Sequence, residues 1–145
     1  MIITRVEWIG AGLMGLVCLA ALLRGGPLER RTALVVAAAW ILSMLVDEDG
    51  NRGVHWRIFA IDLLLMGWLM VEAVVARRIW IMFAAAAQLF IVLTHVAFLM
   101  DPSLMQEGFF SAYYVWSYVV LGALLAGALT ARRAGRGDGA RRGGR

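Results

Sequence analysis

Apolar residues run in five long stretches along the chain, separated by short polar links. The stretches cover residues 6–23, 32–46, 56–76, 79–100 and 109–130. None alternates apolar and polar residues with the period of two that is typical of a barrel strand, and their lengths suit helices. A backbone inside a bilayer must satisfy its own hydrogen bonds, so helices are expected there. The pattern predicts an all-α fold: a polytopic integral membrane bundle of five transmembrane helices within residues 1–130.

The links between these stretches predict how neighbouring helices are joined. Gly25-Gly26-Pro27 follows the first stretch, and glycine followed by proline is typical of a helix end. The third and fourth stretches are separated by Arg77 and Arg78 alone. Two residues allow either a tight antiparallel hairpin or one long bent helix, and we expect the hairpin. The second stretch, residues 32–46, is short for a span, so it either crosses fully or tilts within a complex.

The composition indicates a membrane location. Hydrophobic residues make up 62% of the 145 residues and charged residues 17%, and the mean hydropathy is +0.78. A soluble domain carries about 25% charged residues, and a chain this short leaves much of its surface outside the core. A soluble globular domain is therefore excluded, and so is a sizeable catalytic domain outside the membrane.

The distribution of arginine predicts the orientation. All 14 basic residues are arginine. With the N-terminus outside, eleven of them fall on the cytoplasmic side and three on the outer side. Cytoplasmic loops carry the excess of positive charge, so the chain is expected N-out and C-in. Arginine in place of lysine, with abundant alanine and glycine, favours a GC-rich bacterial genome and therefore the bacterial inner membrane.

Residues 131–145 form a basic tail rich in arginine and glycine. The tail holds six arginines and one acidic residue, Asp138. No aromatic residue lies among the arginines, so nucleic acid is not the expected partner. We expect a disordered cytoplasmic tail in which Arg132, Arg133 and Arg136 face anionic lipid headgroups.

Three polar residues inside the third and fourth stretches form a candidate site. Asp62 and His95 both lie about 8 Å inside the outer boundary, because each is five residues from the polar end of its helix. Gln88 is two turns before His95 on the same helix face. An aspartate beside a histidine can form a proton-responsive pair or a polar ligand pocket. It can also form a structural hydrogen bond between the two helices, and this is the more common case.

Glu72 is the other acidic residue at depth in the third stretch. It lies ten residues after Asp62, on a different face of the helix. We expect its side chain to extend to the cytoplasmic interface or to pair with Arg77 or Arg78.

No motif for a metal, cofactor or catalytic site is evident. Cys18 is the single cysteine, which excludes an intrachain disulfide. Asp47, Asp49 and Asn51 alternate as in a calcium loop, but Arg52 stands where that loop needs glycine. His55 and His95 lack a haem-attachment motif. We expect no cofactor, no bound metal and no enzymatic activity.

Small residues spaced by four mark candidate helix contacts. The pairs are Ala11 with Gly15, Gly122 with Ala126, and Ala123 with Gly127. Such pairs let two helix backbones approach closely, either within one chain or between subunits. The two overlapping pairs of the fifth stretch are the first candidate for an intermolecular face.

These features favour a protein that acts by helix association. It would be an accessory or assembly subunit of a membrane complex, or a homo-oligomer, with lipid and other membrane proteins or itself as partners. The alternative is a small channel or proton-responsive carrier in which Asp62, Gln88 and His95 line a polar site. A second alternative is a holin-like protein that permeabilises the membrane.

Overall fold

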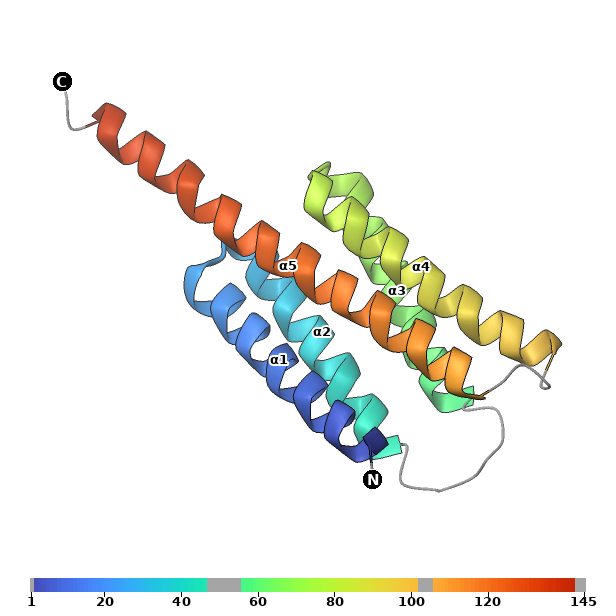
Figure 1. Cartoon of the computed structure of the whole chain (residues 1–145). Helices are drawn as coiled ribbons and strands as arrows, with labels where there is room; N and C mark the ends of the chain where they lie inside the picture. Colours follow the sequence, from blue (N-terminus) through green and yellow to red (C-terminus); the bar gives the residue numbers. More distant parts are fainter. Residues whose placement is uncertain (1, 47–55, 102–105, 143–145) are drawn as a thin grey trace.

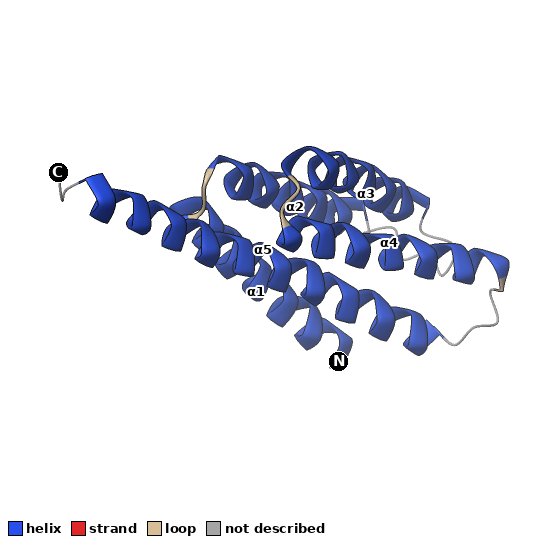
Figure 2. Ribbon diagram, turned by 90° about the horizontal axis from the view of Figure 1, so that it is seen from above, coloured by secondary structure: helices blue, strands red, loops and turns tan. Residues whose placement is uncertain are grey.

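A computed structural model describes the backbone of residues 2–46, 56–101 and 106–142, and the side chains of residues 8–46, 56–101 and 111–131. Every regular element in these residues is a helix (Figure 2). The elements are α1 (Ile2–Arg24), α2 (Pro27–Val46), α3 (Trp56–Ala76), α4 (Ile79–Met100) and α5 (Gln106–Arg142). The predicted all-α fold is thus confirmed.

Two helices extend well beyond the apolar stretches. α2 begins at Pro27, five residues before the predicted start at residue 32. Proline is favoured at the first position of a helix, where its missing N–H needs no partner, and the Arg30 N–H donates to the Gly26 carbonyl at 3.0 Å. α5 continues as helix to Arg142, which differs from the disordered tail predicted after residue 130.

The helices run antiparallel to their chain neighbours (Figure 1). α2 packs against α1 and α3, α4 packs against α3 and α5, and α5 returns to pack against α1. This arrangement closes the bundle around a core from all five helices, and its largest fully buried apolar side chains are Val36, Leu69, Ile81, Leu121 and Leu124.

The predicted hairpin between α3 and α4 is confirmed. Arg77 has a positive φ of 49°, and its N–H donates to the Ala73 carbonyl at 3.1 Å. This is the left-handed residue that commonly ends a helix, a place where glycine is usual because it has no Cβ. Arg77 therefore ends α3 at once and lets α4 start at Ile79.

Among the residues whose side chains are described, three helical segments are long and apolar enough to cross a membrane: Trp56–Ala76, Ile79–Met100 and Ser111–Ala131. The apolar part of α1, Trp8–Arg24, is shorter. Large apolar side chains cover the outside of the bundle, and Leu64, Val75 and Ile79 are about three-quarters exposed. A soluble protein rarely exposes apolar surface on this scale, so the chain is a helical bundle of the membrane type.

Candidate functional site

Asp62, Gln88 and His95 meet in the interior between α3 and α4. The Gln88 amide nitrogen donates to Asp62 Oδ1 at 2.9 Å and to the Asp62 carbonyl at 3.3 Å. His95 Nε2 lies 3.0 Å from Asp62 Oδ2. All three residues are at most 6% exposed. The sequence indicated that Asp62 and His95 could meet, because their helices are joined by two residues and the two side chains lie at matched depth. The structure contains this contact.

The Asp62–His95 contact contains a proton. A carboxylate oxygen and an unprotonated imidazole nitrogen are both acceptors, so a hydrogen bond between them requires one proton on either atom. Gln88 satisfies the other carboxylate oxygen, so both oxygens of Asp62 have partners.

Aromatic rings surround the imidazole. The ring centroids of Phe59 and Tyr113 lie 5.7 Å and 5.8 Å from that of His95. A cavity of about 10 Å³ adjoins Asp62 and Gln88, with Ser43 and Ser117 among its lining residues. That volume suits about one water molecule. The site can therefore hold a proton and fix helix packing, whereas it has no room for a larger ligand.

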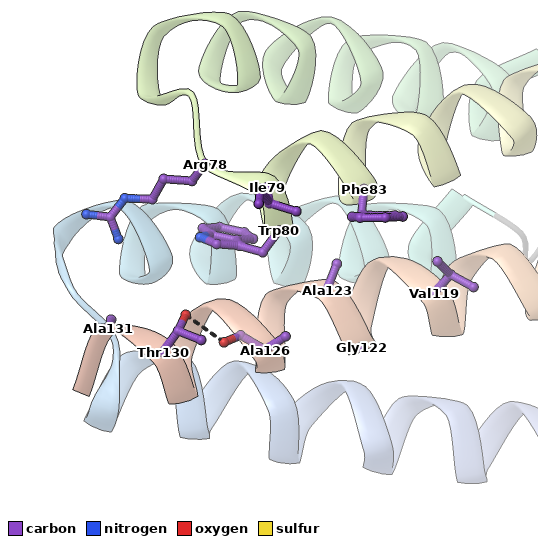
Figure 3. Close-up of a pocket in the computed structure, with 10 residues that line it drawn as sticks. All are labelled: Arg78, Ile79, Trp80, Phe83, Val119, Gly122, Ala123, Ala126, Thr130 and Ala131. Carbon is purple, nitrogen blue, oxygen red and sulfur yellow. Dashed lines mark hydrogen bonds between the residues drawn. The ribbon is translucent and has the colours of Figure 1, made fainter. Parts of the chain in front are cut away.

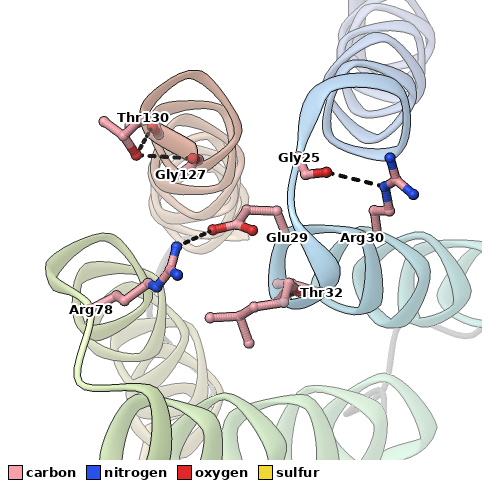
Figure 4. A network of polar contacts seen from close by, with 9 residues as sticks. Gly25, Glu29, Arg30, Thr32, Arg78, Gly127 and Thr130 are labelled. Atoms are coloured by element: carbon pink, nitrogen blue, oxygen red, sulfur yellow. Dashed lines mark hydrogen bonds and ion pairs between the residues drawn. The ribbon is translucent and has the colours of Figure 1, made fainter. Parts of the chain in front are cut away.

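A second polar cluster joins α2 to the connection between α3 and α4 (Figure 4). Arg78 donates from a guanidinium nitrogen to Glu29 Oε1 at 3.1 Å. Two outcomes were expected for Glu72, extension to the interface or pairing with Arg77 or Arg78. Within the described residues its ion pair is instead with Arg31 of α2, at 3.5 Å. The reason is that α2 starts early: its first turns carry Glu29 and Arg31 beside the hairpin.

Glu29 was missed because it lies outside the apolar stretches. Glu29 is only 1% exposed, so it is a buried acidic residue at the end of the bundle. Proline at position 27 followed by an acid two residues later is a helix-start signal that would have extended the helix over it.

Gly25 makes the close approach beside Glu29 possible. A Cβ at Gly25 would lie 2.4 Å from the Ala21 carbonyl oxygen and 2.6 Å from Glu29 Cβ. The Gly25 carbonyl in turn accepts from Arg30 Nε at 3.1 Å (Figure 4). The turn from α1 to α2 therefore requires glycine at this position, and this turn is what brings Glu29 to its buried place.

The small residues of α5 have different surroundings. Gly127 is buried, and a Cβ there would lie 2.6 Å from the Trp80 ring. Ala123 is half-buried, while Gly122 and Ala126 are exposed. Gly127 therefore serves a contact within the chain, whereas Gly122 and Ala126 lie on the outside of the bundle.

The exposed residues Gly122 and Ala126 line a groove between α4 and α5 (Figure 3). The groove has a volume of about 800 Å³. Its walls are mainly apolar, with Ile79, Trp80 and Phe83 from α4 facing Val119, Gly122, Ala123, Ala126, Thr130 and Ala131 from α5, and Arg78 lies at one end.

Most of the other predicted residues lie outside the part of the chain whose side chains are described. Arg132, Arg133 and Arg136 lie on the helical backbone of α5, where side chains are outside the described part. The calcium-like link and His55 also lie outside it. Cys18 is buried in α1. Within the described residues, no group of three His, Cys, Asp or Glu side chains is placed to hold a metal ion.

Comparison with known proteins gives no relative: no protein family, no curated protein and no solved structure matches the chain. The class is therefore defined by the fold and the site alone. It is an all-helical membrane-type bundle with a buried carboxylate–imidazole–amide cluster.

Proposed function

We propose that the chain is a five-span protein of the bacterial inner membrane with its N-terminus outside and its C-terminus inside. α1 and α2 have 23 and 20 residues. At 1.5 Å per residue they are about 34 Å and 30 Å long, which is close to a hydrocarbon thickness of about 30 Å. The three candidate spans provide the rest of the bundle.

The charged end of the bundle supports this orientation. The α1–α2 and α3–α4 connections lie at the same end, where Arg78 pairs with Glu29 and Arg31 with Glu72 (Figure 1). Arginines that gather at one end are expected on the cytoplasmic side. The paired acids also explain how α2 can carry charged residues in its first turns next to the membrane.

Within that membrane we propose that the protein acts by association, as an accessory or assembly subunit or as a homo-oligomer. The observation that carries this proposal is the outer face of α1. Gly12 and Gly15 are exposed, and a Cβ at either would meet nothing within 4 Å. The small residues of α1 therefore leave a shallow strip between exposed side chains such as Leu16 and Leu19.

Glycine has a cost in a helix, so its position needs a reason. Each helical glycine is about 1 kcal/mol less favourable than alanine. Gly10 and Gly127 lie against the side chains of Trp40 and Trp80, respectively, within the chain. Gly12 and Gly15 have no such neighbour among the described residues. A helix of a second protein packed on this strip would use them, because small residues allow close backbone approach in lipid.

Cross-linking in the native membrane tests this face. A cysteine cross-linker attached to Gly15→Cys is expected to join the chain to one membrane protein, or to a second copy, in a defined adduct. Gly67→Cys is the matched control: Gly67 is exposed with equally open surroundings, but it is a single glycine on α3, whereas Gly12 and Gly15 lie one turn apart on one face of α1. Equal adduct patterns from both positions would contradict the proposal.

The Asp62–Gln88–His95 cluster favours a second candidate, a proton-responsive membrane protein. Ionisable residues at membrane depth commonly have functional roles, and histidine changes charge between about pH 5 and 8. A carrier or channel of this kind predicts a pH-dependent flux that Asp62→Asn and His95→Ala abolish while the protein stays folded. Absence of flux in vesicles containing the wild-type protein would exclude it.

A further inference from the structure

The groove between α4 and α5 has one polar end and one apolar end. Arg78, Trp80 and Thr130 lie toward the charged end of the bundle, while Phe83 and Val119 lie farther along (Figure 3). The groove opens on the outside of the bundle, where Phe83 is 63% exposed and Val119 38%. An amphiphile with a polar head and a hydrocarbon chain would match the polar end and the apolar end of this groove.

Trp80 supplies a buried donor that needs an acceptor. The residue is only 8% exposed, and its indole Nε1 has no hydrogen-bond partner in the described part of the structure. The ring lies against Gly127, where even a Cβ would collide with it, which limits how far the ring can move. Figure 3 shows the indole nitrogen on the side of the ring toward Arg78. A buried N–H without an acceptor is unusual and points to a ligand.

Arg78 supplies positive charge next to this donor. Its side chain is 54% exposed, and one guanidinium nitrogen donates to Glu29. A guanidinium has five N–H donors, so this contact leaves others available for an anion. The Thr130 hydroxyl, in contrast, donates to backbone carbonyls of α5. An oxygen-rich anion at the groove end would therefore meet an arginine and an indole N–H.

The dimensions of the groove suit one lipid chain. Its α5 wall extends from Val119 to Ala131, twelve residues farther along the chain, which is about 18 Å along the helix. One leaflet has a hydrocarbon depth of about 15 Å, half of the bilayer core.

We propose that this groove binds one anionic phospholipid. One acyl chain lies between α4 and α5 over Gly122 and Ala126. The phosphate accepts hydrogen bonds from Arg78 and, once the side chains that enclose it shift, from Trp80 Nε1. The site is separate from the α1 face, so it goes beyond the association proposed above.

Native mass spectrometry of the full-length protein with phosphatidylglycerol tests the site. We expect one tightly retained phosphatidylglycerol per chain and weaker retention of phosphatidylcholine. Gly122→Leu and Ala126→Leu fill the groove from exposed positions, and each should lower retention about tenfold. Trp80→Phe keeps a ring but removes the donor, so it should lower retention several-fold. Gly67→Leu, an exposed position on α3, should leave retention unchanged.

Three results would overturn the proposal. The first is equal retention of phosphatidylglycerol by both groove variants and by Gly67→Leu. The second is equal retention of the two lipids by the wild type together with no effect of Trp80→Phe. The third is a dimer that Gly122→Leu and Ala126→Leu abolish while phosphatidylglycerol retention stays the same, which would assign the groove to a second copy of the chain. The first two results do not bear on the α1 face, so they overturn the lipid site alone. The third would in addition move a homo-oligomer contact from α1 to the groove.

Discussion

Asp62 is a carboxylate in an apolar interior whose two oxygens each have a partner. His95 and Gln88 approach it within 3.0 Å and 2.9 Å. Losing one partner in such a cluster leaves a buried polar group unsatisfied, which is more costly than the modest gain from forming the bond. Polar contacts between helices in lipid are themselves individually modest. The cluster therefore stabilises the α3–α4 pair mainly because it is complete.

Asp62→Asn is expected to lower the free energy of unfolding by about 0.5–2 kcal/mol, since the amide cannot accept at both positions. Thr94→Ala is the control. It removes a hydroxyl one residue from His95 that donates only to its own helix, at the Phe90 carbonyl. Unfolding in mixed detergent measures both. Equal stability of the two variants would show that the cluster contributes nothing to packing.

Gly127→Ala is expected to destabilise the fold by about 1–3 kcal/mol, because the new methyl group would lie 2.6 Å from the Trp80 ring. Gly122→Ala should be neutral or slightly stabilising, since a Cβ there meets nothing within 4 Å and alanine favours helix. The thermal midpoints of the two variants give the comparison. Loss of stability at Gly122 and not at Gly127 would contradict the packing of α4 on α5.

At the scale of elements, the hydrophobic pattern predicted the helices but not their charged ends. The α3–α4 hairpin and the Asp62–His95 contact followed from a two-residue link, which leaves little freedom. Glu29 and its partner Arg78 are 49 residues apart and were not predicted, because their contact depends on how α2 packs beside the hairpin. Trp80 and Gly127 were not paired either, since the register of α4 on α5 is set by side-chain shape that periodicity does not contain.

The two ion pairs between α2 and the α3–α4 hairpin should differ in strength. Glu29 is 1% exposed and Arg78 54%, so a double-mutant cycle with Glu29→Gln and Arg78→Gln is expected to give a coupling of about 1 kcal/mol. The Arg31–Glu72 pair is longer, at 3.5 Å, and its arginine is 64% exposed. The same cycle there should give less than about 0.5 kcal/mol. A larger coupling for Arg31–Glu72 would contradict this ranking.

For the whole molecule, the closed arrangement of five helices separates the two faces for which we propose binding roles. α5 packs against both α4 and α1, so the core is complete within one chain. The exposed glycines of α1 and the groove between α4 and α5 then lie on the outside, where lipid and other proteins are reached. This separation is why association and lipid binding are assigned to different helices.

The orientation of the chain in the membrane is also a property of the whole molecule. A fluorescent reporter fused after Arg145 is expected to fluoresce, and alkaline phosphatase fused there to be inactive, because the arrangement we propose, with five spans and the N-terminus outside, would place that end in the cytoplasm. The same reporters fused before the first residue should give the opposite pattern. Active phosphatase at the C-terminal fusion would mean a different number of spans or the reverse orientation.

Gentle extraction of a tagged copy from its native membrane, followed by native mass measurement, tests the central claim of association. The account predicts recovery in a fixed ratio with another membrane protein, or as a homo-oligomer, and loss of that complex in a Gly12→Leu, Gly15→Leu double variant. Gly67→Leu should retain it. Recovery of the wild-type chain as a monomer bearing only lipid would contradict the account.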